Sequence, residues 1–139
     1  MEGKKSDRRK FIIFSPEWSS DETLAPLRQD KYRENVLGID TSDSAFAESD
    51  YHSPTDFFNG EIKRRTEHCE PGTVIFFDDA CDMCDGIQDM VRNLIIKLMR
   101  VGRHRKTACT YCLHRLRHGS WSSQGTSSCK YITVYPRSN

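Results

Sequence analysis

The hydrophobic residues of this chain gather in a few short runs and one long periodic segment. Lys10–Ser15 and Thr73–Phe77 are apolar, β-prone runs closed by turn-forming or acidic residues, and each predicts a short buried strand. Lys130–Tyr135 alternates well enough to predict a final strand, which Pro136 ends. Asn35–Ile39 carries a weaker strand pattern. The chain therefore contains separate strand signals spread from one end to the other.

The most regular segment runs from about Asp85 to Val101, where apolar residues recur at steps of three and four. This spacing predicts an amphipathic helix, with Gly102 as its C-terminal stop. Acidic residues near its start and basic residues at its end match the helix dipole. We expect the apolar face over residues 87–99 to form core, and a homodimer could also use it.

Residues 16–60 are acidic, rich in Ser and Asp, and poor in regularly spaced apolar positions. We expect much of this stretch to be irregular, with a short helix at Leu24–Tyr32 and a turn at Asn59-Gly60. The sequence thus predicts an α+β fold: a small zinc-stabilised domain with one long helix and a few short strands, after a partly irregular acidic segment. The expected division is a basic tail at 1–10, the acidic segment at 11–65 and a basic zinc-binding domain at 66–139.

Composition and compartment bear on the role of the cysteines. Only 36% of the 139 residues are hydrophobic, so the core is modest and a metal would supplement it. The first ten residues are mostly charged, and the apolar run Phe11–Phe14 that follows is too short for a signal peptide. No span approaches the roughly 20 apolar residues of a membrane helix. We expect an intracellular protein of the nucleus or cytoplasm, without a membrane partner, in which thiols stay reduced.

Two Cys-x-x-Cys pairs, separated by 24 residues, carry the clearest chemical signal. Cys81 and Cys84 form the first pair, and Cys109 and Cys112 form the second. Four thiolates of this kind suit one tetrahedral Zn²⁺ ion. The interval is longer than in common four-cysteine modules and contains a whole helix, so other ligand sets stay open. The alternative ligands are His114 and His118 with the second pair, or His68, Cys69 and Cys129.

Two family resemblances follow from these cysteines. The order of strand, Asp-Asp-Ala-Cys-Asp-Met-Cys and amphipathic helix resembles the active-site segment of thioredoxin-like oxidoreductases, which implies Cys81 as nucleophile and Cys84 as resolving thiol. The segment around Cys109 and Cys112 is similar to the second zinc knuckle of papillomavirus early oncoproteins. No Leu-x-Cys-x-Glu motif is present, so the second resemblance implies only a viral accessory or regulatory protein as one setting for such a chain.

Charge is strongly segregated along the sequence. Residues 1–89 hold 11 basic and 20 acidic side chains, whereas residues 90–139 hold 10 basic and none acidic. A basic block of this kind attracts nucleic acid or an acidic protein partner. The candidate nucleic-acid-binding residues flank the second cysteine pair: Arg100, Arg103, Arg105, Lys106, Arg115 and Arg117.

No catalytic motif accompanies these features. The sequence has no Gly-x-Ser-x-Gly, no Gly-rich phosphate loop ending in Lys-Ser/Thr and no His-Glu-x-x-His, so we do not expect an enzyme. The main hypothesis is a zinc-binding regulatory module that binds RNA or DNA. The alternatives are a protein-interaction adaptor, whose acidic segment folds on a partner, and the thiol-disulfide oxidoreductase.

Overall fold

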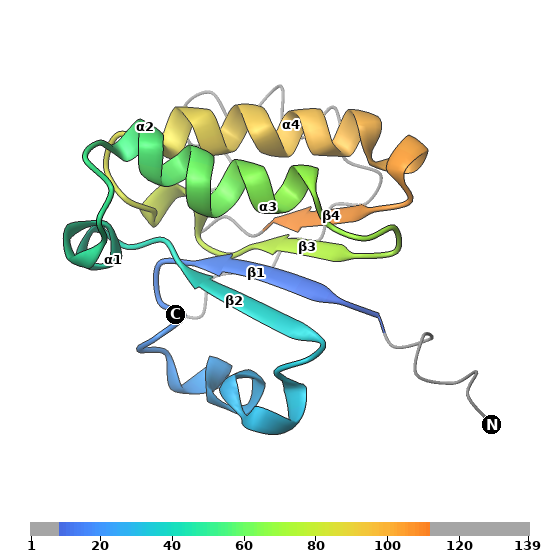
Figure 1. Ribbon diagram of the computed structural model, residues 1–139, viewed down its shortest axis with the longest axis horizontal. Helices are drawn as coiled ribbons and strands as arrows, with labels where there is room; N and C mark the ends of the chain where they lie inside the picture. The colour runs from blue at the N-terminus through green and yellow to red at the C-terminus, as the bar shows by residue number, and fades with distance from the viewer. Residues whose placement is uncertain (1–8, 112–139) are drawn as a thin grey trace, which may run out of the picture.

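A computed structural model describes residues 9–111 of the chain, and the Arg103 side chain is outside this description. Four strands form one sheet in the order β2-β1-β3-β4, and every neighbouring pair is parallel (Figure 1). Their bounds are β1 Phe11–Ser15, β2 Val36–Asp40, β3 Val74–Phe77 and β4 Ala108–Tyr111. The expected mixture of helix and strand is confirmed. Zinc stabilisation is not shown.

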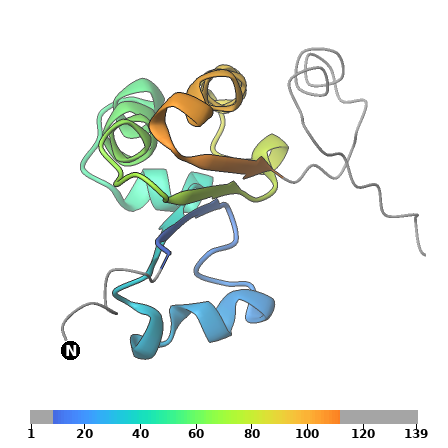
Figure 2. The same ribbon diagram turned by 90° about the vertical axis from the view of Figure 1, so that its right-hand side faces the viewer.

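Helices connect the strands and cover both faces of the sheet. Two 3₁₀ helices, η2 Glu22–Arg28 and η3 Asp30–Tyr32, lie between β1 and β2 on one face. On the other face lie the helices between β2 and β3 and the long helix between β3 and β4 (Figure 2). These are α1 Asp43–Glu48, α2 Pro54–Phe57, the π-helix η4 Phe58–Lys63, α3 Arg64–Glu67 and, after the short η5 Ala80–Asp82, α4 Gln88–Arg105. Parallel strands need such crossovers.

The core lies between the sheet and the helices of this second face. Ile12, Phe14, Ile75 and Phe77 alternate toward it from β1 and β3, and the Phe14 and Phe77 rings stack with centroids 5.0 Å apart. The helix α4 contributes Ile87, Val91, Leu94, Ile95 and Leu98, all buried. The expected core role of the apolar face at 87–99 is therefore seen in the structure, and a homodimer through it stays a prediction.

The segment at 11–65 belongs to the same sheet as the segment at 66–139. It contributes β1 and β2, and the other segment contributes β3 and β4. The acidic stretch expected to be largely irregular contains β2 and a run of helix from Pro54 to Glu67 through α2, η4 and α3. Both segments thus build one core.

Two local predictions are wrong for identifiable reasons. Asn59-Gly60 forms no turn but lies in the π-helix, where Gly60 leaves room for Tyr51: a Cβ at Gly60 would come within 2.4 Å of its hydroxyl. Gly102 does not stop the long helix, which continues to Arg105 and ends at Lys106 in a left-handed conformation. A Cβ at Gly102 would lie 2.8 Å from the Thr107 carbonyl, so this glycine permits the chain to fold back.

None of the helices in the described part of the chain is long and apolar enough to cross a membrane.

Candidate functional site

The carboxyl ends of β1 and β3 lie side by side at the centre of the sheet, and the chain leaves them toward opposite faces. After β1 it passes to η2 and η3, whereas after β3 it passes to α4 on the other face (Figure 2). Neighbouring parallel strands that diverge in this way open a crevice, which is where ligands bind in open α/β sheets. We therefore take this point as the candidate site.

A hydrogen bond joins the two strands across this point. The Ser15 hydroxyl, at the end of β1, donates to Asp78 Oδ2 at 2.9 Å, directly after β3. Ser15 is fully buried, and its Oγ also accepts from the Glu17 backbone N–H at 3.1 Å. The Asp78 N–H donates to the Phe14 carbonyl at 2.8 Å, which extends the parallel ladder to the aspartate. Backbone and side chain together hold the Asp78 carboxylate at the point where the two strands diverge.

Asp79 follows with an unusual backbone. Its φ of 48° and ψ of 50° put it in the left-handed region. Residues other than glycine seldom adopt this conformation, although aspartate does so more often than most. The residue is only 8% exposed, and its carbonyl accepts from the Asp82 N–H at 2.9 Å. Strain of this kind concentrates at functional sites in proteins. Here it turns the chain sharply away from β3 and leaves Asp78 at the edge.

The loop after β2 packs against the loop after β3. The Cys84 N–H donates to the Thr41 carbonyl at 2.7 Å, and the Asp85 N–H donates to Asp43 Oδ1 at 2.8 Å. Thr41 is fully buried, and its hydroxyl has no hydrogen-bond partner in the described part of the chain. This edge is rich in carboxylates, which come from the last residue of β2 and from the segments that follow β1, β2 and β3: Glu17, Asp40, Asp43, Asp78, Asp79, Asp82 and Asp85. Such an edge favours a cation.

The cysteine pairs are arranged differently from the expected zinc site. Cys81 and Cys84 follow the end of β3, whereas Cys109 lies within β4, level with Ile75. Cys112 lies outside the described residues. Within residues 9–111, no three His, Cys, Asp or Glu side chains are placed to share a metal ion. Zinc binding by these four cysteines stays a prediction.

Cys84 is the most deeply buried of the described cysteines, at 1% exposure. Burial first, and then the nearby carboxylates of Asp43 and Asp85, together raise the pKa of its thiol to about 11. Its sulfur lies 3.4 Å from the Asp85 carbonyl, to which the thiol donates. This environment keeps the thiol protonated near neutral pH. The zinc site and the oxidoreductase alternative that include Cys84 stay predictions.

The alternative metal ligands are not brought together by the described structure. The Cys69 thiol donates to the Thr66 carbonyl at 3.4 Å, and His68 and Cys69 precede β3, whereas Cys81 and Cys84 follow it. His68 and Cys69 therefore lie at the opposite end of β3 from Cys81 and Cys84. His114, His118 and Cys129 lie outside the described residues.

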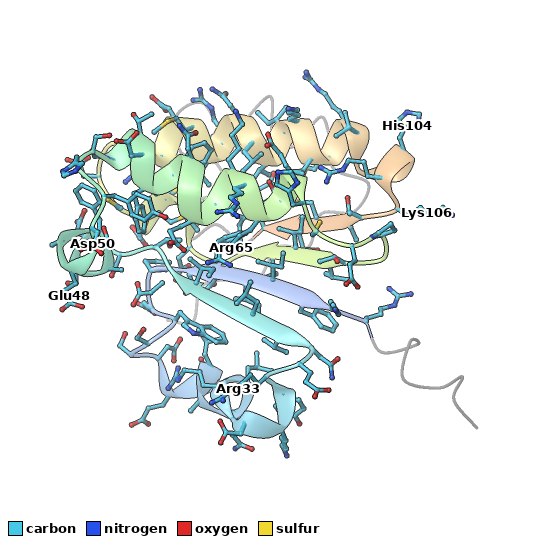
Figure 3. The ribbon with its side chains drawn as sticks, viewed as in Figure 1. Arg33, Glu48, Asp50, Arg65, His104 and Lys106 are labelled. Carbon is cyan, nitrogen blue, oxygen red and sulfur yellow. The ribbon has the colours of Figure 1, made fainter. Side chains whose placement is uncertain are left out.

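The candidate basic residues that the structure describes lie at the other end of the sheet or on α4. Arg105 donates to the Glu67 carbonyl at 2.5 Å, and Lys106 follows the helix near the amino ends of the strands. Figure 3 shows His104 and Lys106 at the end of the molecule opposite Glu48 and Asp50. Arg100 lines a hollow of about 360 Å³ on α4. The side chain of Arg103 and the whole of Arg115 and Arg117 lie outside the description.

Sequence reasoning missed Ser15, Thr41 and Asp78 as site residues. It identified Asp78-Asp79 only as the end of a strand. The signal that could have found them is an aspartate directly after an apolar strand, read together with a parallel sheet, because only parallel pairing brings these strand ends to one edge.

No family model, curated protein or solved structure matches this chain.

Proposed function

We propose that the carboxyl edge at β1 and β3 binds Mg²⁺ together with the phosphates of a nucleotide. The observation that carries this proposal is the hydrogen bond from Ser15 to Asp78 across the point where the two strands diverge. The buried Ser15 hydroxyl fixes the Asp78 carboxylate where open α/β sheets bind ligands. Oxygen donors of this kind suit Mg²⁺ better than zinc.

The small number of protein oxygen donors at this edge fits a cation that binds together with the phosphates of a nucleotide. Mg²⁺ keeps several waters and is held by one or two carboxylates plus substrate phosphates, so it needs no cage of three protein ligands. In P-loop NTPases an aspartate at the end of a strand and a Ser or Thr hydroxyl hold it in this way. The sequence contains no Gly-rich phosphate loop ending in Lys-Ser/Thr. We therefore assign only the cation-binding part of such a site, to Asp78, with Ser15 holding its carboxylate in place.

A paramagnetic ion tests this assignment, because Mn²⁺ replaces Mg²⁺ and accelerates water-proton relaxation more strongly when its complex is held on a protein. We expect the chain to enhance relaxation by Mn²⁺–ATP and Asp78→Asn to reduce the enhancement severalfold. Asp30→Asn is the matched control, since Asp30 is an exposed carboxylate on η3. An equal enhancement with Asp78→Asn, or none with the unaltered chain, rejects the proposal.

A second function, binding of RNA or DNA through the basic residues, is favoured by where those residues lie. Lys106 shares a hollow of about 440 Å³ with Arg9 and Lys10, although these residues are far apart in the sequence. Phosphate contacts by such cations predict binding that weakens steeply with salt. Oligonucleotide affinity that is flat between low and physiological salt would exclude this function.

Zinc binding is a separate proposal supported by the spacing of the cysteine pairs. Metal analysis of the reduced protein tests it: one zinc per chain, lost in both Cys81→Ser and Cys109→Ser, is the result a shared site requires.

A further inference from the structure

The amino edge of the sheet carries a hollow whose charged lining comes from three separate segments. Arg9 and Lys10 lead into β1, Glu70 precedes β3, and Lys106 follows α4. Backbone hydrogen bonds fix these segments to one another: the Gly72 N–H donates to the Lys106 carbonyl at 2.6 Å, and the Val74 N–H donates to the Lys10 carbonyl at 2.9 Å. The position of the charges is therefore set by the sheet.

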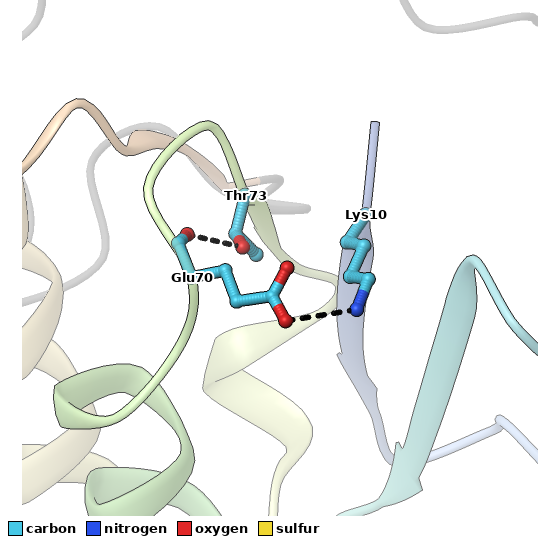
Figure 4. Close-up of polar contacts among 3 residues, drawn as sticks. All are labelled: Lys10, Glu70 and Thr73. Carbon is cyan, nitrogen blue, oxygen red and sulfur yellow. Dashed lines mark hydrogen bonds and ion pairs between the residues drawn. The ribbon is translucent and has the colours of Figure 1, made fainter. Parts of the chain in front are cut away.

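The hollow holds three cations and one carboxylate. Lys10 Nζ lies 3.1 Å from Glu70 Oε1, and the Glu70 carbonyl accepts from the Thr73 hydroxyl at 2.6 Å (Figure 4). The two charged side chains remain 49% and 68% exposed. An exposed ion pair of this kind contributes little to stability, about 0–1 kcal/mol. The Glu70 carboxylate is thus an anion held weakly among cations, while its backbone is held firmly.

We propose that this hollow binds a phosphate group and that the Glu70 carboxylate competes for the same cations. A phosphate offers more acceptor oxygens than a carboxylate, and it can contact Arg9, Lys10 and Lys106 together. The inference rests on the nucleic-acid function proposed above and gives it a site.

The same cations have a structural role that the test must separate. Basic residues at the C-terminal end of a helix stabilise its dipole, and Arg105 and Lys106 occupy that position on α4. A role limited to the helix end predicts that neutralising Lys106 lowers stability without changing the affinity for phosphates. Glu70 distinguishes phosphate binding from stabilisation of the helix end most clearly. It lies outside α4 and carries the charge opposite to that of Lys106.

The test measures fluorescence anisotropy of a labelled single-stranded oligonucleotide across a salt series. We expect Lys10→Gln and Lys106→Gln each to weaken binding and to reduce the slope of log affinity against log salt by about one. Glu70→Gln should tighten binding severalfold at low salt, because it removes the competing anion. Lys31→Gln is the control: Lys31 lies over the Tyr32 ring on η3, and its loss should leave the slope unchanged.

Competition identifies the source of the phosphate. Displacement of the oligonucleotide by millimolar inorganic phosphate or pyrophosphate indicates that a single phosphate group fills the hollow. Displacement only by unlabelled oligonucleotide indicates that the hollow binds a nucleic-acid backbone. If the unaltered chain binds the oligonucleotide and all three substitutions in the hollow behave like Lys31→Gln, the hollow is not the phosphate site. The proposed nucleic-acid function would still stand. A chain that binds no oligonucleotide at low salt overturns both.

Discussion

The two ends of the parallel sheet hold their polar groups in opposite ways. At the carboxyl edge Ser15 is fully buried and Asp79 nearly so. At the amino edge the charged side chains of Lys10 and Glu70 are about half exposed or more. Buried polar groups need fixed partners, whereas exposed charges are free to exchange partners with a ligand. The carboxyl edge is therefore preorganised, and the amino edge is adaptable.

The largest expected difference between the two edges is in packing. Phe77→Ala removes a fully buried ring that stacks on Phe14 beneath the carboxyl edge, and we expect a loss of about 3–5 kcal/mol in unfolding free energy. Phe11→Ala, at the amino end of β1 where the ring is 38% exposed, should lose far less. Urea denaturation measures both. Similar losses for the two variants would show that the edges do not differ in packing.

A smaller difference should appear in alkaline solution. The pKa of Cys84 is raised to about 11 in the folded chain, above about 8.5 for an unfolded cysteine, so the folded state holds the proton more tightly. Its contribution to stability is complete below pH 8.5 and is lost as the pH rises to 11, by roughly 2–3 kcal/mol. Unfolding measured across this range should show that loss in the unaltered chain.

Two cysteine variants separate this contribution from other groups that titrate at high pH. Cys84→Ala should have a flatter pH dependence than the unaltered chain, although its stability at neutral pH is lower. Cys69→Ala, which alters a cysteine before β3, should keep the original dependence. Identical pH profiles for the two variants would contradict the assignment to Cys84.

The smallest predicted effect compares the two ends of β1. Ser15→Ala removes the hydroxyl that donates to Asp78, so we expect a loss of about 1–2 kcal/mol in unfolding free energy. Lys10→Gln removes only an exposed ion pair and should cost less than about 0.5 kcal/mol. Thermal and urea unfolding of the two variants give the comparison. A loss with Lys10→Gln as large as that with Ser15→Ala would contradict it.

Apolar periodicity predicted the elements that carry the core. The runs at Lys10–Ser15 and Thr73–Phe77 became β1 and β3, and the helix expected from Asp85 to Val101 became α4 with bounds shifted toward the C-terminus. These elements are strongly apolar, so local pattern and tertiary burial agree. The helical run Pro54–Glu67 was missed because Asn59-Gly60 reads as a turn locally. Its start, Ser53 capping the Asp56 N–H with Pro54 at the first position, was the available signal.

The candidate sites depended on pairings that no local pattern encodes. The two cysteine pairs are alike in spacing, but the β3–β4 register places Cys109 within a strand and Cys81 beyond the end of its neighbour. Conversely, Ser15 and Asp78 are 63 residues apart in sequence, and only the parallel β1–β3 pairing brings them together. The charge asymmetry did indicate the basic residues, but not that Lys106 and Lys10 line the same hollow.

Residue-resolved NMR with Mn²⁺–ATP tests whether the carboxyl edge, and not the amino edge, binds the metal–nucleotide complex. We expect the amide signals of Ser15, Asp78 and Asp79 to broaden at low Mn²⁺–ATP concentrations and those of Lys10 and Lys106 to stay sharp. Asp78→Asn should abolish the broadening. Broadening centred on the amino edge, or broadening at the carboxyl edge that persists in Asp78→Asn, would contradict this assignment.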